Sequence, residues 1–377
     1  MSRRSSTKVV FLPKVKTAGI TSERSPKMLE ILSNAYEVSA VPTSRVNDFV
    51  FDQRRNKLAR YMLFPVDVAI NLLRTLQALG EDGELVFAEG SYFSFAAGMA
   101  ARLKRVPMIW DNHGHIVTFA QVQGKSRFFT KGNVLFERAL VGMSSKVLVV
   151  NERDRQDYIS MGFDPEKLVV VPTFANMTVV EKRMLPREEA RRSLGIPLEE
   201  KVVLFVGTLN YEPNIDAVAY FASILPQVRR EVPNTCFYVA GSGPAPFEPP
   251  EGMRFLGFVP DLYPWLSAAD LCVAPMWKGL GILTKVIDYL SSARATVVTP
   301  LALDGIPELE HEENCLLGKD KEDFKVQTVR ALRDDALRDR LASAGRELIA
   351  QGYSSEVVER SLTKLVDSLV DGGSIRS

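Results

Sequence analysis

The sequence is poor in cysteine and has no long apolar run. Cys236, Cys272 and Cys315 are far apart and show no CxxC spacing, so we expect a reducing compartment and no zinc site. The longest uncharged stretch, residues 232–247, contains three prolines and two glycines, which excludes a membrane-spanning helix there. These absences leave a soluble globular enzyme or binding protein as the expected class.

Common nucleotide-binding fingerprints are missing as well. Gly241-Ser242-Gly243 follows an apolar run, but Pro244 and Pro246 stand where a dinucleotide fingerprint needs a helix and a third glycine. The sequence has no GxxxxGK[ST] motif, which excludes a P-loop NTPase, and no Asp-x-Asp pair, which argues against a diphosphate site built around a divalent metal. We therefore expect neither a cofactor nor a bound metal.

The sequence does contain strand-like and helix-like segments in alternation, as is typical of an α/β protein. Its 377 residues are 46% hydrophobic and 25% charged, which is ordinary for two globular domains. Short apolar runs alternate with helical patterns, which predicts parallel sheets covered on both faces. The predicted strands are residues 9–12, 85–88, 106–110, 147–150, 202–206, 236–240, 254–256, 271–274 and 296–298.

The strands form two series, separated by a polar stretch with prolines at residues 172–200. We predict two doubly wound, Rossmann-like domains, residues 1–180 and 181–353, with a last helix at about 354–370 that crosses back to the first domain. Ligands of such sheets bind beyond the carboxyl ends of the strands, so we expect the two domains to face a cleft that holds the site.

Charge is unevenly distributed along the chain. The net charge is +1, yet the first sixty residues hold 12 Lys and Arg against 5 Asp and Glu. Basic and aromatic residues alternate at 49–65 and 125–131, which suits an anionic membrane surface, although a helix with a solvated basic face fits equally. No nucleic-acid motif accompanies the charge. Met1–Ser6 does not resemble a signal peptide, so we expect a cytoplasmic protein, peripheral on the inner face of the cell membrane.

The most informative segment is 279–290, Gly-Leu-Gly-Ile-Leu-Thr-Lys-Val-Ile-Asp-Tyr-Leu. Gly279 and Gly281 let the backbone approach a ligand closely, and the helix that follows offers free N–H groups to a phosphate. Lys285 lies near the start of that helix with Asp288 three residues on, hence on the same face. The alternative is an ordinary helix start with an exposed ion pair.

Three further segments precede this motif in the sequence, at 206–214, 254–262 and 265–275. Together with it they resemble the donor domain of retaining glycosyltransferases of the GT-B fold, family 4 type, over residues 200–350. The motif matches the subgroup that reads Gly-x-Gly-x-x-x-Lys-x-x-Glu, with Asp288 in place of Glu.

The resemblance implies a nucleoside-diphosphate sugar as donor. It implies backbone contacts to the base, a carboxylate on the ribose, and glycines and a lysine on the diphosphate. The residues it assigns to the donor are Gly207, Phe258, Val259, Gly279, Gly281, Ile282, Lys285 and Asp288.

Two departures from the family pattern affect these assignments. Thr208 and Asn214 occupy the places of a basic pair in the turn after the first strand, so Lys285 is expected to be the main cation, with Lys278 assisting. Leu280 stands where many members have an acid, which leaves the sugar contact and the donor's identity open.

In the first domain the similarity is fainter. His113 and His115 follow a strand end where the family commonly carries a histidine near the transferred sugar, and we take both as candidate catalytic residues. Glu89, also at a strand end, is a candidate contact to the acceptor or the sugar. Structural hydrogen bonding is the alternative for the two histidines, and a polar turn is the alternative for Glu89.

The resulting hypothesis is a metal-independent glycosyltransferase that acts with retention on a glycan or lipid-linked acceptor. Two alternatives remain open at this point. One is a GT-B-like nucleotide-sugar epimerase. The other is a non-catalytic subunit that binds a nucleotide sugar or a glycan, because the missing acid at Leu280 is compatible with lost activity.

Overall fold

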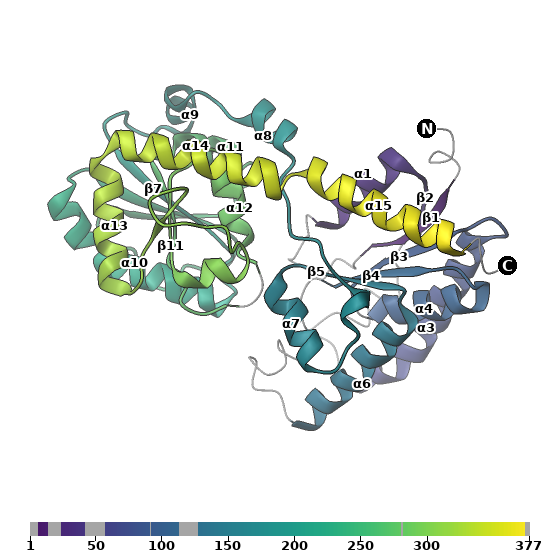
Figure 1. The fold of residues 1–377 in the computed structure, drawn as a ribbon. Coiled ribbons are helices and arrows are strands. Elements are labelled where there is room, and N and C mark those ends of the chain that lie inside the picture. The colour runs from purple at the N-terminus through teal and green to yellow at the C-terminus, as the bar shows by residue number, and fades with distance from the viewer. Residues whose placement is uncertain are drawn as a thin grey trace. The chain divides into compact units, whose positions relative to one another are not determined.

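The computed structural model describes residues 7–13, 24–41, 57–90, 92–112, 127–279 and 282–373. The chain divides into two compact units. The first comprises Met1–Pro172 and Val358–Ser377, and the second comprises Thr173–Val357 (Figure 1). The domain boundary predicted at residue 180 falls a few residues after this division.

The first unit is built on a parallel sheet with the strand order β2-β1-β3-β4-β5-β6. Most of these strands are short apolar runs buried on both faces, as expected of a parallel sheet between helical layers. The strands are β1 (Lys8–Leu12), β2 (Glu37–Ala40), β3 (Leu85–Glu89), β4 (Met108–Asp111), β5 (Lys146–Val149) and β6 (Leu168–Val170).

Helices cover both faces of this sheet (Figure 1). Three of them, α3, α4 and α6, pack side by side on one face, and α1 and α15 lie on the other. Tyr36, just after α1, donates a hydrogen bond of 2.8 Å to Asp367 on α15. The helices are α1 (Arg24–Ala35), α3 (Lys57–Leu79), α4 (Tyr92–Lys104), α6 (Arg127–Met143), α7 (Glu152–Ser160) and α15 (Ser355–Gly373).

The second unit repeats the architecture with the strand order β12-β11-β10-β7-β8-β9, again all parallel. Its strands are β7 (Lys201–Val206), β8 (Thr235–Ala240), β9 (Met253–Gly257), β10 (Leu271–Ala274), β11 (Thr296–Val298) and β12 (Leu316–Leu317). Its helices are α8 (Met177–Arg183), α9 (Arg187–Leu194), α10 (Glu212–Glu231), α11 (Tyr263–Ala268), α12 (Thr284–Ser291), α13 (Lys321–Arg333) and α14 (Asp335–Gly352).

The strand order of the second unit reverses at β7. The chain runs outward from β7 through β8 to β9, and then returns to the other side of β7 with β10. The carboxyl ends of β7 and β10 therefore border a topological switch point, which is where open α/β sheets bind their ligands. The segments after these two strands contain Gly207 and Lys285.

All nine predicted strands are confirmed, and α15 confirms the predicted last helix. Three strands were missed, namely β2, β6 and β12. They have four, three and two residues, and the half-exposed β2 carries Glu37 and Ser39. β2 and β12 lack an apolar run as long as those of the predicted strands, so nothing in their sequence distinguishes them from loops, whereas β6 lies in the apolar run at residues 168–171, which was not assigned to a strand. Among the described residues, no helix is both long and apolar enough to cross a membrane.

Candidate functional site

At the carboxyl edge of the second sheet, two glycine turns are in close contact. A Cβ atom on Gly241 would lie 1.9 Å from the carbonyl oxygen of Gly207, so position 241 accepts no side chain without moving the turn. Gly207 N–H bonds Ala240 at 2.9 Å, and Leu209 N–H bonds Ser242 at 2.7 Å. The turn after β7 is thus fixed to the turn after β8, and the side chain of Asn214 lies against Gly207.

Lys285 lies in the first turn of α12, as predicted. Its side chain is only 9% exposed. Its Nζ donates a hydrogen bond of 2.7 Å to Oδ1 of Asn214, lies 3.7 Å from Sδ of Met276, and stands 4.0 Å from the centroid of the Phe205 ring. Lys285 forms no ion pair with any residue that the structure describes, so the predicted alternative, an exposed ion pair with Asp288, is wrong.

Burial has a clear electrostatic effect on this lysine. It lowers the pKa of Lys285 to about 7, because the charged ammonium loses its hydration and gains only neutral partners. A buried cation without a carboxylate beside it is unusual in proteins. An anion that reached this ammonium would meet a positive charge not already neutralised by a carboxylate.

Asn214 connects Lys285 to the turn after β7. It lies in the first turn of α10 and is buried, and its Nδ2 donates a hydrogen bond of 2.9 Å to the carbonyl oxygen of Thr208. Thr208 in turn bonds the carbonyl oxygen of Ser242 at 3.0 Å. From the sequence, Thr208 and Asn214 were interpreted only as replacements for a basic pair, so this contact was not predicted.

The other residues assigned to the donor lie along the same edge or follow β9. Asp288 is half-buried, one turn beyond Lys285 on α12. Half-buried Ile282 packs against Gly305, where an added Cβ would meet its Cα at 2.7 Å. Phe258 is 75% exposed and follows β9 together with half-buried Val259.

Several predicted positions remain expectations. Gly279 lies just before the gap in the described residues, and a Cβ on it would meet Leu301 at 3.3 Å. Gly281 and Leu280 fall in that gap, and His113 and His115 also lie outside the described residues. Their predicted roles stay predictions.

In the first unit, the polar side chains at the carboxyl edge engage one another. Asp111 accepts two hydrogen bonds from Arg24, at 3.0 and 3.1 Å, and both side chains are buried. Glu89, at the end of β3, is fully buried and accepts a hydrogen bond from Ser25 Oγ. These contacts favour the structural interpretation of Glu89 over a direct contact with the acceptor.

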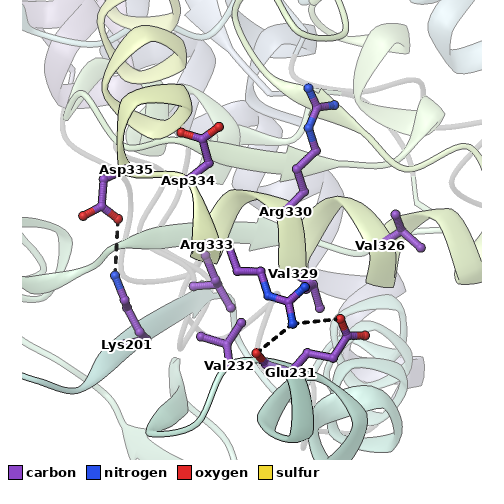
Figure 2. Close-up of a pocket in the computed structure, with 10 residues that line it drawn as sticks. Lys201, Glu231, Val232, Val326, Val329, Arg330, Arg333, Asp334 and Asp335 are labelled. Carbon is purple, nitrogen blue, oxygen red and sulfur yellow. Dashed lines mark hydrogen bonds and ion pairs between the residues drawn. The ribbon is translucent and has the colours of Figure 1, made fainter.

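The second unit also has a pocket of about 930 Å³, shown in Figure 2, at the opposite end of its sheet. Lys201 at the start of β7 and Glu231 at the end of α10 line it together with the end of α13. In this pocket Lys201 pairs with Asp335 at 3.4 Å and Arg333 pairs with Glu231 at 3.2 Å (Figure 2). Because it lies at the amino edge and its lysine and this arginine are paired, we do not assign it to the donor.

Comparison with known proteins finds glycosyltransferase family models in both units. Residues 200–334 match the family model of group 1 glycosyl transferases, and residues 33–173 match that of the glycosyl transferase 4-like domain. These matches lie in the second and the first unit respectively. Both units of the chain thus match glycosyltransferase family models, group 1 in the second unit and the 4-like domain in the first.

Curated relatives that are named glycosyltransferases are similar to part of this chain. TuaC of Bacillus subtilis (strain 168), a glycosyltransferase assigned to teichuronic acid biosynthesis, is 27% identical over 262 residues, which are 67% of this chain and 62% of TuaC. D-inositol 3-phosphate glycosyltransferase of Mycobacterium tuberculosis (strain ATCC 25177 / H37Ra) is 30% identical over 187 residues, which are 45% of this chain and 37% of that enzyme. The chain thus matches less than two thirds of either relative.

Solved structures confirm the predicted GT-B fold. Sucrose-phosphate synthase from Thermosynechococcus elongatus aligns with a TM-score of 0.73 and 15% identity over 97% of this chain and 100% of that one. Anabaena HepE in complex with UDP aligns with a TM-score of 0.71 and 14% identity, over 96% and 100%. At this identity the likeness shows the fold alone.

Proposed function

We propose that the chain transfers a glycosyl group from a nucleoside-diphosphate sugar to an acceptor hydroxyl. The observation that carries the proposal is the buried ammonium of Lys285, which has only neutral partners and stands at the topological switch point beside the turn of Gly207. A leaving diphosphate gains negative charge as the glycosidic bond breaks, and a positioned cation stabilises that charge more in the transition state than in the ground state.

The first turn of α12 supports the same role. The chain enters this helix at Thr284 without a side-chain cap, so backbone N–H groups there are available to phosphate oxygens. Lys285 and the helix terminus together supply the positive charge that other transferases obtain from a metal ion, and the sequence contains no Asp-x-Asp pair. We therefore propose a metal-independent reaction that needs no cofactor, with retention as the family resemblance implies.

The remaining donor contacts are proposed along the same edge. Asp288 holds the ribose, Gly279, Gly281 and Ile282 lie against the diphosphate, and the backbone at 258–259 contacts the base. HepE was solved in complex with UDP and with UDP-glucose, which makes a uracil nucleotide the first donor to test. His113 and His115 are proposed on the side of the transferred sugar.

The acceptor and the place of action are proposals of the same kind. TuaC is named for teichuronic acid, which supports a glycan acceptor, whereas the mycobacterial relative is named for inositol 3-phosphate, a small phosphorylated polyol. We propose a cytoplasmic protein whose basic N-terminal region rests on an anionic membrane surface. Sedimentation with anionic vesicles at low salt, reversed at high salt and absent with neutral vesicles, is the expected result.

The test of the proposed function is transfer from radiolabelled nucleotide sugars, starting with UDP-glucose, to a glycan and lipid extract. Replacing Lys285 by Met should reduce kcat/KM by about 100- to 1,000-fold, because a positioned charge on the leaving group is lost. The matched control is Lys201→Met, which removes a lysine from the other edge of the same sheet. An unchanged kcat/KM in Lys285→Met contradicts the proposal.

The same assay separates the alternative functions. Interconversion of the free donor without transfer would support an epimerase. Donor binding with neither transfer nor hydrolysis would support a binding subunit.

A further inference from the structure

We propose that Asn214 is a positioning residue for Lys285. Its side-chain amide holds the Lys285 ammonium and ties it to the carbonyl group of Thr208, so that the cation and the glycine turn after β7 form one donor-binding unit. What this unit binds rests on the proposed function. The link between Asn214 and Lys285 does not, and it can be measured without any donor.

The geometry assigns both ends of the amide. An ammonium group can only donate and a carbonyl group can only accept, so Oδ1 of Asn214 must face Lys285 and Nδ2 must face Thr208. The two hydrogen bonds, of 2.7 and 2.9 Å, agree with this orientation. Gly207 lies directly against the same amide, since a Cβ atom there would stand 2.7 Å from Nδ2. Asn214 is therefore held between the turn and the lysine.

An amide suits this place better than the residues that could replace it. A carboxylate would accept the same hydrogen bond from Lys285, but it would neutralise the ammonium and repel a diphosphate. An apolar side chain would leave the buried Nζ of Lys285 without an oxygen partner, which costs more for a charged donor than for a neutral one. Asn fixes the ammonium and leaves its charge available.

The surroundings of Lys285 make its charge sensitive to position 214. Phe205 on β7 and Met276 after β10 are uncharged. Among the charged groups on the neighbouring elements, Asp216 on α10 lies 3.7 Å from Lys278, both largely exposed, and Asp288 lies one turn along α12. With burial lowering the pKa of Lys285 to about 7, a change of partner at position 214 alters the charged fraction near neutral pH.

The first experiment is an NMR titration of the full chain labelled with 13C at lysine Cε, with the Lys285 signal assigned by its loss in Lys285→Met. Asn214→Asp should raise the pKa of Lys285 by at least about one unit, because an opposite charge at hydrogen-bond distance favours the ammonium. Asn214→Ala should lower it further, because the hydrogen bond to the charged form is lost. The opposite signs distinguish positioning from a general loss of packing.

The matched control is Asn234→Asp, which makes the same chemical change at an exposed asparagine before β8, on the other edge of the sheet. Solvent and salt should keep its effect on Lys285 below about 0.3 unit. A pKa of Lys285 that is unchanged in Asn214→Asp overturns the inference. If Asn214→Ala does not fold, the Asp variant and its control decide the matter alone.

The second experiment is calorimetric binding of UDP between pH 5.5 and 9. In the wild type the affinity should fall as Lys285 loses its proton. Asn214→Ala should move this fall to lower pH, and Asn214→Asp should weaken binding at least about tenfold at pH 6 through repulsion of the diphosphate. Shifted pKa values with no binding of UDP, GDP or ADP by the wild type would remove the proposed function and leave the Asn214–Lys285 link standing.

Discussion

The two edges of the second sheet each contain a buried cation, but only the one at the amino edge is paired with a carboxylate. At the amino edge, Arg191 is 1% exposed and donates a 2.7 Å hydrogen bond to Asp270, which also accepts from the backbone of Val202 at 2.6 Å. At the carboxyl edge, Lys285 is buried against Asn214 with no carboxylate bonded to it. The first arrangement holds α9 to the sheet, whereas the second leaves a buried positive charge without a carboxylate partner.

The difference separates a buried charge that is neutralised within the protein from one that is not. A buried ion pair is complete within the protein, so removing one partner leaves an uncompensated charge. A buried lysine with neutral partners already lacks a compensating charge, and the folded state bears that cost without a ligand. Removing one buried charge should therefore have opposite effects on stability at the two edges.

The largest expected effect is at the amino edge. Asp270→Asn should lower the free energy of unfolding by about 3–5 kcal/mol, because Arg191 stays buried without its counter-charge. Urea denaturation followed by circular dichroism measures the change. A loss below about 1 kcal/mol would mean that Arg191 is held mainly by the backbone carbonyl groups to which it also donates, such as that of Ala268 at 3.1 Å.

The next effect concerns the close contact between the glycine turns. Gly241→Ala should cost about 1–3 kcal/mol in unfolding free energy, because its Cβ would overlap the carbonyl oxygen of Gly207. UDP binding should weaken as the turn after β7 moves. The matched control is Gly142→Ala, on α6, where nothing lies within 4 Å of an added Cβ and alanine favours the helix. Equal stability of the two variants would contradict the tight packing of the turns.

The smallest effect has the opposite sign. Lys285→Met should raise the free energy of unfolding by about 1–2 kcal/mol at pH 6, where both the folded and the unfolded wild type carry the lysine proton and burial penalises the charge. Between pH 7 and 10.5 the unfolded wild type binds a proton that the folded protein has lost, so wild-type stability rises with pH. The advantage of the variant should therefore disappear by about pH 10. Urea denaturation of the two proteins at pH 6, 8 and 10 checks this.

The fold could largely be predicted from the sequence because its strands are continuous apolar runs. The run at 271–274 and the run at 85–88 needed no tertiary information. The short β2 and β12 were missed because pairing with neighbours, not their own composition, makes them strands.

The site was predictable only in part. Lys285 follows two glycines at a helix start, a pattern that is local and readable. Its partner Asn214 is 71 residues away in the sequence, so only the folded structure shows that the two side chains are in contact. In the sequence, Asn214 was notable only because it stands where many family members have a basic residue. In the structure, its side chain accepts a hydrogen bond from Lys285.

The path of α15 has a practical consequence for dividing the protein. The second unit is one uninterrupted stretch, Thr173–Val357, whereas the first needs a helix from the far end of the chain. Leu362 and Val366 on that helix are fully buried. A fragment ending at Pro172 would expose the apolar surface that they cover, so the first unit should be produced with α15 fused or supplied as a peptide. The second unit is the one suited to expression by itself.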